Sequence, residues 1–150
     1  MGRINRFNSH CDLVKMQPRG LEKQRESLVT AYKLLENGWG LNLGKLEPQR
    51  LELAGNLEFI EVKVRFYPPI SNFILEGERR HPRQKITTGF IDQNGQYSYI
   101  EYAIDLPGRS LNEFSRWVYR YMDKAQVLSP PQLVAEHHKY AEALLDRYVN

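Results

Sequence analysis

The sequence has one cysteine, no long apolar run and no apolar leader, and each absence removes a class of protein. A lone Cys11 cannot form an intrachain disulfide, so the chain suits a reducing compartment. No stretch approaches the roughly 20 apolar residues that span a bilayer. The first residues, MGRINRFNSHCDLVKM, do not have the pattern of a secretory signal. We therefore expect a cytoplasmic protein with no membrane association.

A strong charge of either sign is also missing. The formal net charge is +3 and the pI is about 9.0, which is mild for a protein that coats nucleic acid. Any anion binding should therefore be local. The 150 residues are 41% hydrophobic and 26% charged, which suits one globular domain with or without an appendage.

The residue patterns of metal, nucleotide and catalytic sites are not found. His137 and His138 are adjacent, so on a helix they point about 100° apart, and we expect one at the core edge and one in solvent. His10-Cys11-Asp12 places a thiol, an imidazole and a carboxylate side by side, but catalytic groups are normally assembled in space. Gly38-Trp39-Gly40 lacks the preceding strand of a nucleotide-binding motif. The sequence thus predicts no enzyme, no cofactor and no metal.

Residues 1–60 are expected to form a helical linker segment. Apolar residues at helical spacing predict a helix over 19–37, ended by Asn37-Gly38. Its apolar face comprises Leu21, Leu28, Val29, Ala31, Tyr32, Leu34 and Leu35. Residues 38–59 contain four glycines and one proline among apolar residues, and this composition indicates a connection with short extended pieces.

Strand patterns begin at residue 61. Val62, Val64 and Phe66 alternate with polar residues, which predicts a strand with one buried face. A short helix over 70–77 should follow, with Ile70, Phe73 and Ile74 pointing inward. Residues 84–91 and 97–106 predict two further strands, joined by a hairpin at Asn94-Gly95.

The C-terminal part predicts two more helices with a strand between them. Ser110-Leu111-Asn112-Glu113 has the form of a capping box. The helix that it opens should place Leu111, Phe114, Val118, Tyr121 and Met122 inward, with Trp117 at the edge. Residues 125–129 predict a strand, and Ser129 is the expected cap of a last helix with proline at its first position. One stripe of that helix comprises Leu133, His137, Ala141, Leu144 and Tyr148.

The order from residue 61 to 150 is β, α, β, β, α, β and a final helix. We therefore predict an α+β domain with a ferredoxin-like βαββαβ antiparallel sheet, two helices on one face and an extra C-terminal helix, preceded by the helical N-terminal segment. The opposite sheet face should carry Lys63, Arg65, Tyr99, Glu101 and Ala103.

One short stretch concentrates positive charge. Five of the seven residues 79–85 are basic or can become so: Arg79, Arg80, His81, Arg83 and Lys85. They could form a solvated turn, partly neutralised by Glu76 and Glu78, or they could bind an anion through the guanidinium groups. In the second case Tyr97 and Tyr99 could stack on bases.

Several motifs, taken in order, carry a family resemblance. They are VKVRF from residue 62, Arg80-His81-Pro82 with Gln84, Trp117 in a helix, and the run VLSP from Val127. Together they resemble the C-terminal extension of WYL-domain proteins, the WCX domain, over residues 61–150. Upstream, RINRF is similar to a strand of the WYL barrel and AYKLLENGWGLNL to the linker helix. The Trp-Tyr-Leu tripeptide, a full barrel and a winged-helix domain are absent, so the resemblance implies a C-terminal piece or a truncated relative.

The resemblance implies a bacterial transcription regulator of a family with members linked to CRISPR loci or DNA damage. It implies a homodimer and a nucleic-acid-like ligand such as a single strand or a nucleotide. The anion-facing residues would be Arg80, His81, Arg83 and Gln84, flanked by Arg79 and Lys85, although His81 could instead order the turn by hydrogen bonding. The rival prediction is a protein-binding adaptor with an inert basic turn. A nuclease is a distant third, because no carboxylate cluster with metal spacing is present.

Overall fold

The computed structural model describes residues 20–149. The RINRF stretch and His10-Cys11-Asp12 lie outside the described residues, so the interpretations placed on them stay predictions. In chain order the elements are α2 (Leu21–Asn37), α3 (Leu46–Leu53), β1 (Ile60–Phe66), α4 (Ile70–Glu76), β2 (Lys85–Thr88), β3 (Ile100–Leu106), η1 (Gly108–Ser110), α5 (Leu111–Tyr119), η2 (Met122–Lys124), β4 (Ala125–Ser129) and α6 (Pro131–Val149).

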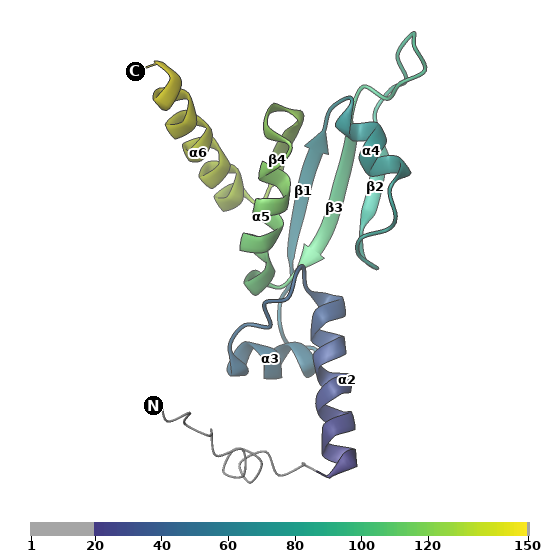
Figure 1. Cartoon of the computed structure of the whole chain (residues 1–150), viewed down its shortest axis with the longest axis vertical. Coiled ribbons are helices and arrows are strands. Elements are labelled where there is room, and N and C mark those ends of the chain that lie inside the picture. The colour runs from purple at the N-terminus through teal and green to yellow at the C-terminus, as the bar shows by residue number, and fades with distance from the viewer. Residues whose placement is uncertain (1–19, 150) are drawn as a thin grey trace, which may run out of the picture.

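The four strands form one antiparallel sheet in the order β2-β3-β1-β4 (Figure 1). Val64 of β1 pairs with Tyr102 of β3 on one side and with Val127 of β4 on the other. On the far side of β3, Ile86 of β2 also pairs with Tyr102. The predicted α+β class, antiparallel sheet and C-terminal helix are confirmed, and the ferredoxin-like designation stays a prediction.

Alternation along the two central strands separates a core face from an open face. Val62, Val64 and Phe66 are buried, as predicted, and so are the β3 residues Ile100, Tyr102, Ile104 and Leu106. The intervening residues are only partly covered, and there Arg65 forms an ion pair with Glu101 while its guanidinium lies 4.1 Å from the centre of the Tyr99 ring. Arg65 and Glu101 therefore neutralise each other on the open face.

The strands β2 and β3 are joined by a hairpin arm that projects from the sheet (Figure 1). The tip is a turn in which the amide of Gly95 donates to the carbonyl of Asp92, and Ile91 and Tyr97 form a bridge below it. The hairpin is thus confirmed, but β2 has only four residues where eight were predicted. Gly95 has φ +75°, the left-handed conformation that favours glycine in such a turn.

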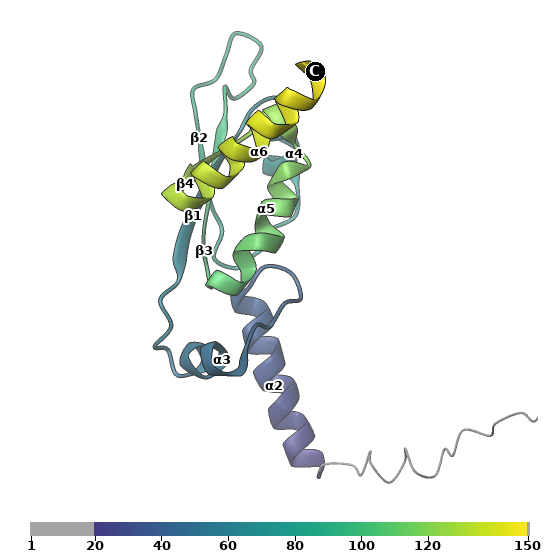
Figure 2. The same ribbon diagram turned by 90° about the vertical axis from the view of Figure 1, so that its left-hand side faces the viewer.

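Helix α5 covers the core face of the sheet (Figure 2). Phe114 and Val118 are buried as predicted, but Trp117 lies within the core at 6% exposure and Met122 is 63% exposed, so both of those placements were wrong. The reason is that α5 ends at Tyr119, and Met122 starts a 3-10 turn with φ +46°. In α4 the prediction for Phe73 was also wrong, because Phe73 is exposed while Ser71 and Ile74 are buried.

The predicted capping box is not formed. Ser110 is helical, in a 3-10 turn that precedes α5, and its side chain caps no amide of α5. Its hydroxyl accepts a hydrogen bond from the amide of Trp39 at 2.9 Å, and the Glu113 carboxylate accepts one from the amide of Leu41 at 3.0 Å. Both side chains therefore hold the loop that follows α2.

The N-terminal segment combines the predicted helix with one that was not predicted. Helix α2 is confirmed, but only Leu34 on its apolar face is buried. Residues Leu46–Leu53 form α3 where an extended connection was expected. Pro48 is compatible with this helix because it occupies the first turn, where a backbone N–H has no acceptor within the helix.

The final helix starts at Pro131, one residue later than the Pro130 that a Ser129 cap predicts, and Ser129 points elsewhere. The Ser129 hydroxyl lies 3.4 Å from the Glu61 carbonyl of β1, to which it donates, so its prediction as a cap was wrong. Leu133 anchors the start of α6 in the core, and the rest of the helix extends away from the sheet (Figure 1). Large apolar side chains are exposed on its second half: Tyr140, Leu144, Leu145, Tyr148 and Val149.

Candidate functional site

The basic stretch 79–85 is a turn held together by Gln84. The Gln84 Oε1 accepts hydrogen bonds from the amides of Arg80 and His81 at 2.8 and 3.0 Å, and from the Tyr102 hydroxyl at 2.9 Å. The two amide bonds lie within the turn, and the bond from Tyr102 links the turn to the buried face of β3. Gln84 therefore orders the turn from inside.

Two of the predicted anion-binding arginines are engaged within the protein. The Arg79 guanidinium donates to the backbone carbonyls of His81 and Pro82. The Arg83 guanidinium donates to the Asn37 side chain and lies 4.5 Å from the centre of the Phe59 ring. Arg79 therefore stabilises the turn internally, and Arg83 connects the turn to the N-terminal segment.

Of the six residues predicted from the sequence, Arg80 and His81 reach a common pocket. Lys85 is exposed on β2 and pairs with Ala103, whose side is the open face of the sheet. Arg79, Arg83 and Gln84 do not line the pocket. The structure thus separates the linear cluster, and it brings other residues to Arg80 and His81.

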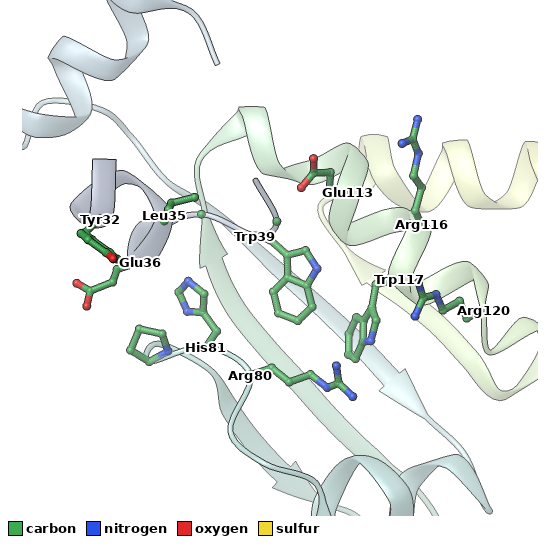
Figure 3. Close-up of a pocket in the computed structure, with 13 residues that line it drawn as sticks. Tyr32, Leu35, Glu36, Trp39, Arg80, His81, Glu113, Arg116, Trp117 and Arg120 are labelled. Atoms are coloured by element: carbon green, nitrogen blue, oxygen red, sulfur yellow. The ribbon is translucent and has the colours of Figure 1, made fainter. Parts of the chain in front are cut away.

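The pocket lies between the end of α2, the turn 79–82 and α5 (Figure 3). Its volume is about 900 Å³, which is within the range of small-molecule sites. The cationic side chains that line it are those of Arg80, Arg116 and Arg120. Aromatic and acidic neighbours complete the wall: Tyr32, Glu36, Trp39, Glu113 and Trp117.

Arg116 and Arg120 were not predicted as site residues. They are four residues apart, so the helical path of α5 and its C-cap places them on the same side. Trp117 between them turns into the core and fixes the rotation of the helix. Two arginines four residues apart, on either side of a core tryptophan, indicate a cationic helix face next to the core. The sequence does not show that the turn 79–82 lies opposite this face.

The guanidinium groups of Arg80, Arg116 and Arg120 make no hydrogen bond or ion pair within residues 20–149. Arg80 lies over the Trp117 ring, with 5.5 Å from its guanidinium carbon to the ring centre. Of the two carboxylates in the wall, Glu113 already accepts the Leu41 amide. Unpaired guanidinium groups are suited to phosphate or carboxylate, so the pocket can take an anion.

Trp39 brings an aromatic ring from the N-terminal segment into the centre of the site. Its ring packs edge-on against Phe114 at 5.0 Å and lies 4.9 Å from the ring of Trp117, measured between centroids. Trp39 is partly exposed and Tyr32 is exposed, so both offer ring surface to a ligand. Flat aromatic surface beside cations is the combination that binds nucleobases and their phosphates.

His81 is buried beneath this surface with one nitrogen unpartnered. Its Nδ1 accepts the Arg83 amide at 3.0 Å, so the neutral ring carries its proton on Nε2, which has no acceptor in hydrogen-bonding geometry. Burial lowers the pKa of His81, although the carbonyls of Glu36, Asn37 and Gly38 favour the charged form. His81 is therefore a neutral ring that packs the α2 terminus against the turn.

Within residues 20–149, no group of His, Cys, Asp and Glu could hold a metal ion. His137 packs on the Tyr119 ring with 4.2 Å between centroids, and His138 is exposed near Glu142. The predicted division into a core-edge and a solvated histidine is confirmed. In the same part of the chain, no helix is long and apolar enough to cross a membrane.

Comparison with protein families gives one match, the WCX domain, over residues 58–145. The matched range covers more than half of the chain. The chain belongs to the WCX domain family. No curated protein matches the sequence significantly.

The motifs that suggested this family occupy defined places in the WCX domain. The VKVRF run is in β1, the His-Pro-x-Gln run is the turn before β2, and Trp117 is in the last turn of α5. The VLSP run leads from β4 to α6. Membership is consistent with the C-terminal module of a WYL-type regulator. Trp39, Leu34 and Glu52 precede the matched residues, yet they pack against the WCX domain.

Proposed function

We propose that this chain is the ligand-sensing C-terminal module of a WYL-type transcription regulator, and that its pocket binds a nucleic-acid-like anion. The proposal combines membership of the WCX family with the chemistry of the pocket. The observation that carries it is the grouping of Arg80, Arg116 and Arg120, unpaired within the described residues, around one aromatic-walled cavity.

The proposed ligand is a single strand or a nucleotide-like molecule. Guanidinium groups supply planar donors to its phosphates, and the exposed rings of Tyr32 and Trp39 supply surfaces for its bases. Arg79, Arg83 and Gln84 then act indirectly, since their contacts shape the turn that presents Arg80. Lys85 is assigned no direct contact.

The direct test is titration of a short fluorescein-labelled oligothymidylate, followed by anisotropy, at about 50 and about 200 mM salt. Each phosphate contact to a single strand contributes about −0.7 to the slope of log K against log salt, so three contacts predict a slope near −2. The Arg116→Ala/Arg120→Ala variant should bind more weakly and show a slope that is shallower by about 1.4.

A matched control removes two exposed cations that do not line the pocket, in the variant Lys139→Ala/Arg147→Ala on α6. This variant has the same formal charge as the pocket variant and should bind as the wild type does. Equal binding by all three proteins would reject the pocket as the site. Absence of binding by the wild type would favour the rival function, an adaptor without a nucleic-acid ligand.

We further propose that the chain is a homodimer that pairs through α6. The helix presents Tyr140, Leu145 and Tyr148 to solvent, and contiguous apolar surface of this kind is unusual on a monomer. Sedimentation equilibrium should give a dimer for the wild type and a monomer for Leu145→Glu/Tyr148→Glu. Phe90→Glu, an equally exposed position on the hairpin arm, is the control. A monomeric wild type would contradict this part of the proposal.

The proposed role is non-enzymatic and requires no cofactor. A regulator that senses a nucleic-acid-like ligand would act in the bacterial cytoplasm, which is the location we propose. The links to CRISPR loci or DNA damage implied by the family resemblance stay predictions.

A further inference from the structure

The pocket is shared between two parts of the chain. One wall belongs to the WCX domain, through the turn 79–82 and α5. The other belongs to the end of α2 and the loop after it, between Tyr32 and Gly40. These residues are part of a segment that continues through α3, and we call residues 32–53 the linker. Since Tyr32, Glu36 and Trp39 of the linker line the same cavity as Arg80 and Arg116, a ligand there touches both parts.

A buried arginine makes four of the hydrogen bonds that hold the linker to the WCX domain. The Arg109 guanidinium donates to both carboxylate oxygens of Glu52, at 2.8 and 3.1 Å. It also donates to the carbonyls of Leu34 at 2.6 Å and Asn42 at 2.7 Å. The side chains of Arg109 and Glu52 are 6% and 0% exposed. One side chain therefore ties α2, the loop and α3 to the start of α5.

The same helix carries the ligand-facing side chains. Ser110, in the 3-10 turn before α5, and Glu113, in the first turn of α5, accept the amides of Trp39 and Leu41. Arg116 and Arg120 follow one and two turns later and line the pocket. The 3-10 turn η1 and the first turn of α5 thus hold the linker, and the next turns of α5 line the pocket.

We propose that occupancy of the pocket is coupled to docking of the linker, so that an anionic ligand stabilises the docked arrangement. This inference rests on the proposed function. Its physical basis is reciprocity: if docking completes the wall that binds the ligand, the ligand must stabilise docking by the same factor. The linker leads from the WCX domain toward the preceding part of the chain, so its docking carries the signal.

The test compares two carboxylates of the same helix. Glu52→Gln keeps the shape of the side chain but removes the charge that Arg109 binds, and neither residue lines the pocket. Glu47→Gln is the matched control, because Glu47 pairs with Arg50 at the surface of α3. Ser110→Ala is a second undocking variant in case Glu52→Gln fails to fold, which circular dichroism reports. The probe is the labelled oligothymidylate.

We expect Glu52→Gln to raise the Kd of the probe about fivefold or more, while Glu47→Gln leaves it unchanged. Hydrogen exchange at the amides of Gly38, Trp39 and Leu41 should slow when the probe is added to the wild type and should be faster in Glu52→Gln. Unchanged affinity in a variant whose linker amides exchange faster would overturn the coupling but leave the binding site in place. Exchange unchanged in both undocking variants would also overturn it. A wild type that does not bind the probe would reject the proposed function and the coupling together.

Discussion

The rings of His81 and Trp39 lie nearly parallel, 21° apart with 6.5 Å between their centroids. His81 belongs to the basic turn and Trp39 to the linker, so this predicted site residue packs against the segment that completes the pocket. Its Nδ1 accepts the Arg83 amide, which requires the neutral ring. The basic turn is therefore a support for the linker as well as the source of Arg80.

This contact makes stability depend on pH. Burial holds the pKa of His81 below 6.5, the value expected in the unfolded chain, and burial lowers the pKa of His137 in the same direction. Below pH 6.5 the unfolded state binds protons more readily than the folded state, so the free energy of unfolding falls as the pH falls. Well above pH 6.5 these groups are neutral in both states and the full stability is present.

Urea denaturation at about pH 7.5 and about pH 5.5 measures this difference. The drop in unfolding free energy should be smaller in His81→Gln than in the wild type, and smaller again in His81→Gln/His137→Gln. Parallel pH profiles for the three proteins would show that these histidines are not buried in their neutral form.

Gln84 should matter for stability more than its position in a basic cluster indicates. Its Oε1 accepts three hydrogen bonds, and each contributes about 1 kcal/mol net. Gln84→Ala should therefore lower the unfolding free energy by about 3 kcal/mol, measured by urea denaturation. Gln93→Ala, at the exposed tip of the hairpin, provides the comparison. A loss no larger than that of Gln93→Ala would mean that Gln84 does not hold the turn.

Breaking the ion pair between Arg109 and Glu52 should be severe. Arg109→Ala leaves the Glu52 carboxylate buried without its partner, and such a loss typically lowers stability by about 3–5 kcal/mol. Arg50→Ala breaks the exposed pair with Glu47 and should change stability by less than about 1 kcal/mol. Equal effects of the two substitutions in urea would contradict the assignment of Arg109 as the anchor of the linker.

Alanine substitutions at two glycines distinguish the cost of backbone strain from the cost of a clash with α5. Gly40 and Gly55 have φ of +79° and +76°, so alanine at either should lower stability by about 1–2 kcal/mol through strain. At Gly55 the added methyl meets open space, whereas at Gly40 it would lie 1.4 Å from a carboxylate oxygen of Glu113. Gly40→Ala must displace that carboxylate from the Leu41 amide, at a further loss of about 1.5 kcal/mol or more.

The matching control for this pair is made in the Glu113→Ala background. There the carboxylate is gone, and Gly40→Ala should be no more destabilising than Gly55→Ala in thermal or urea unfolding. A Gly40 penalty that persisted without Glu113 would place the strain in the loop itself.

The two central strands were predictable because each has its own periodic signal. Val62, Val64 and Phe66 alternate with charges whatever the rest of the chain does, and the same holds for the residues of β3. Helix α3 carried no such signal, because it is short and buries Glu52 rather than an apolar stripe. Its position depends on Arg109, which is 57 residues away.

Of the three arginines that line the pocket, only Arg80 was predicted from the sequence. Arg80 was found because basic residues are consecutive in its turn, but Arg116 and Arg120 reach the pocket only through the packing of α5. The capping box predicted at Ser110 and Glu113 was wrong for a related reason, because it too depends on tertiary contacts. Those acceptors satisfy amides of Trp39 and Leu41, which are distant in sequence, and local spacing cannot distinguish these donors from amides of the helix itself.

The central claim is that an anionic ligand enters the pocket between the linker and α5. Both tryptophans of the chain, Trp39 and Trp117, line this pocket, so intrinsic tryptophan emission reports on its occupancy. Titration with unlabelled oligothymidylate should change the emission saturably in the wild type, with weaker affinity at higher salt and in Arg116→Ala/Arg120→Ala. Binding seen by anisotropy with no change in tryptophan emission would place the ligand elsewhere and contradict the account.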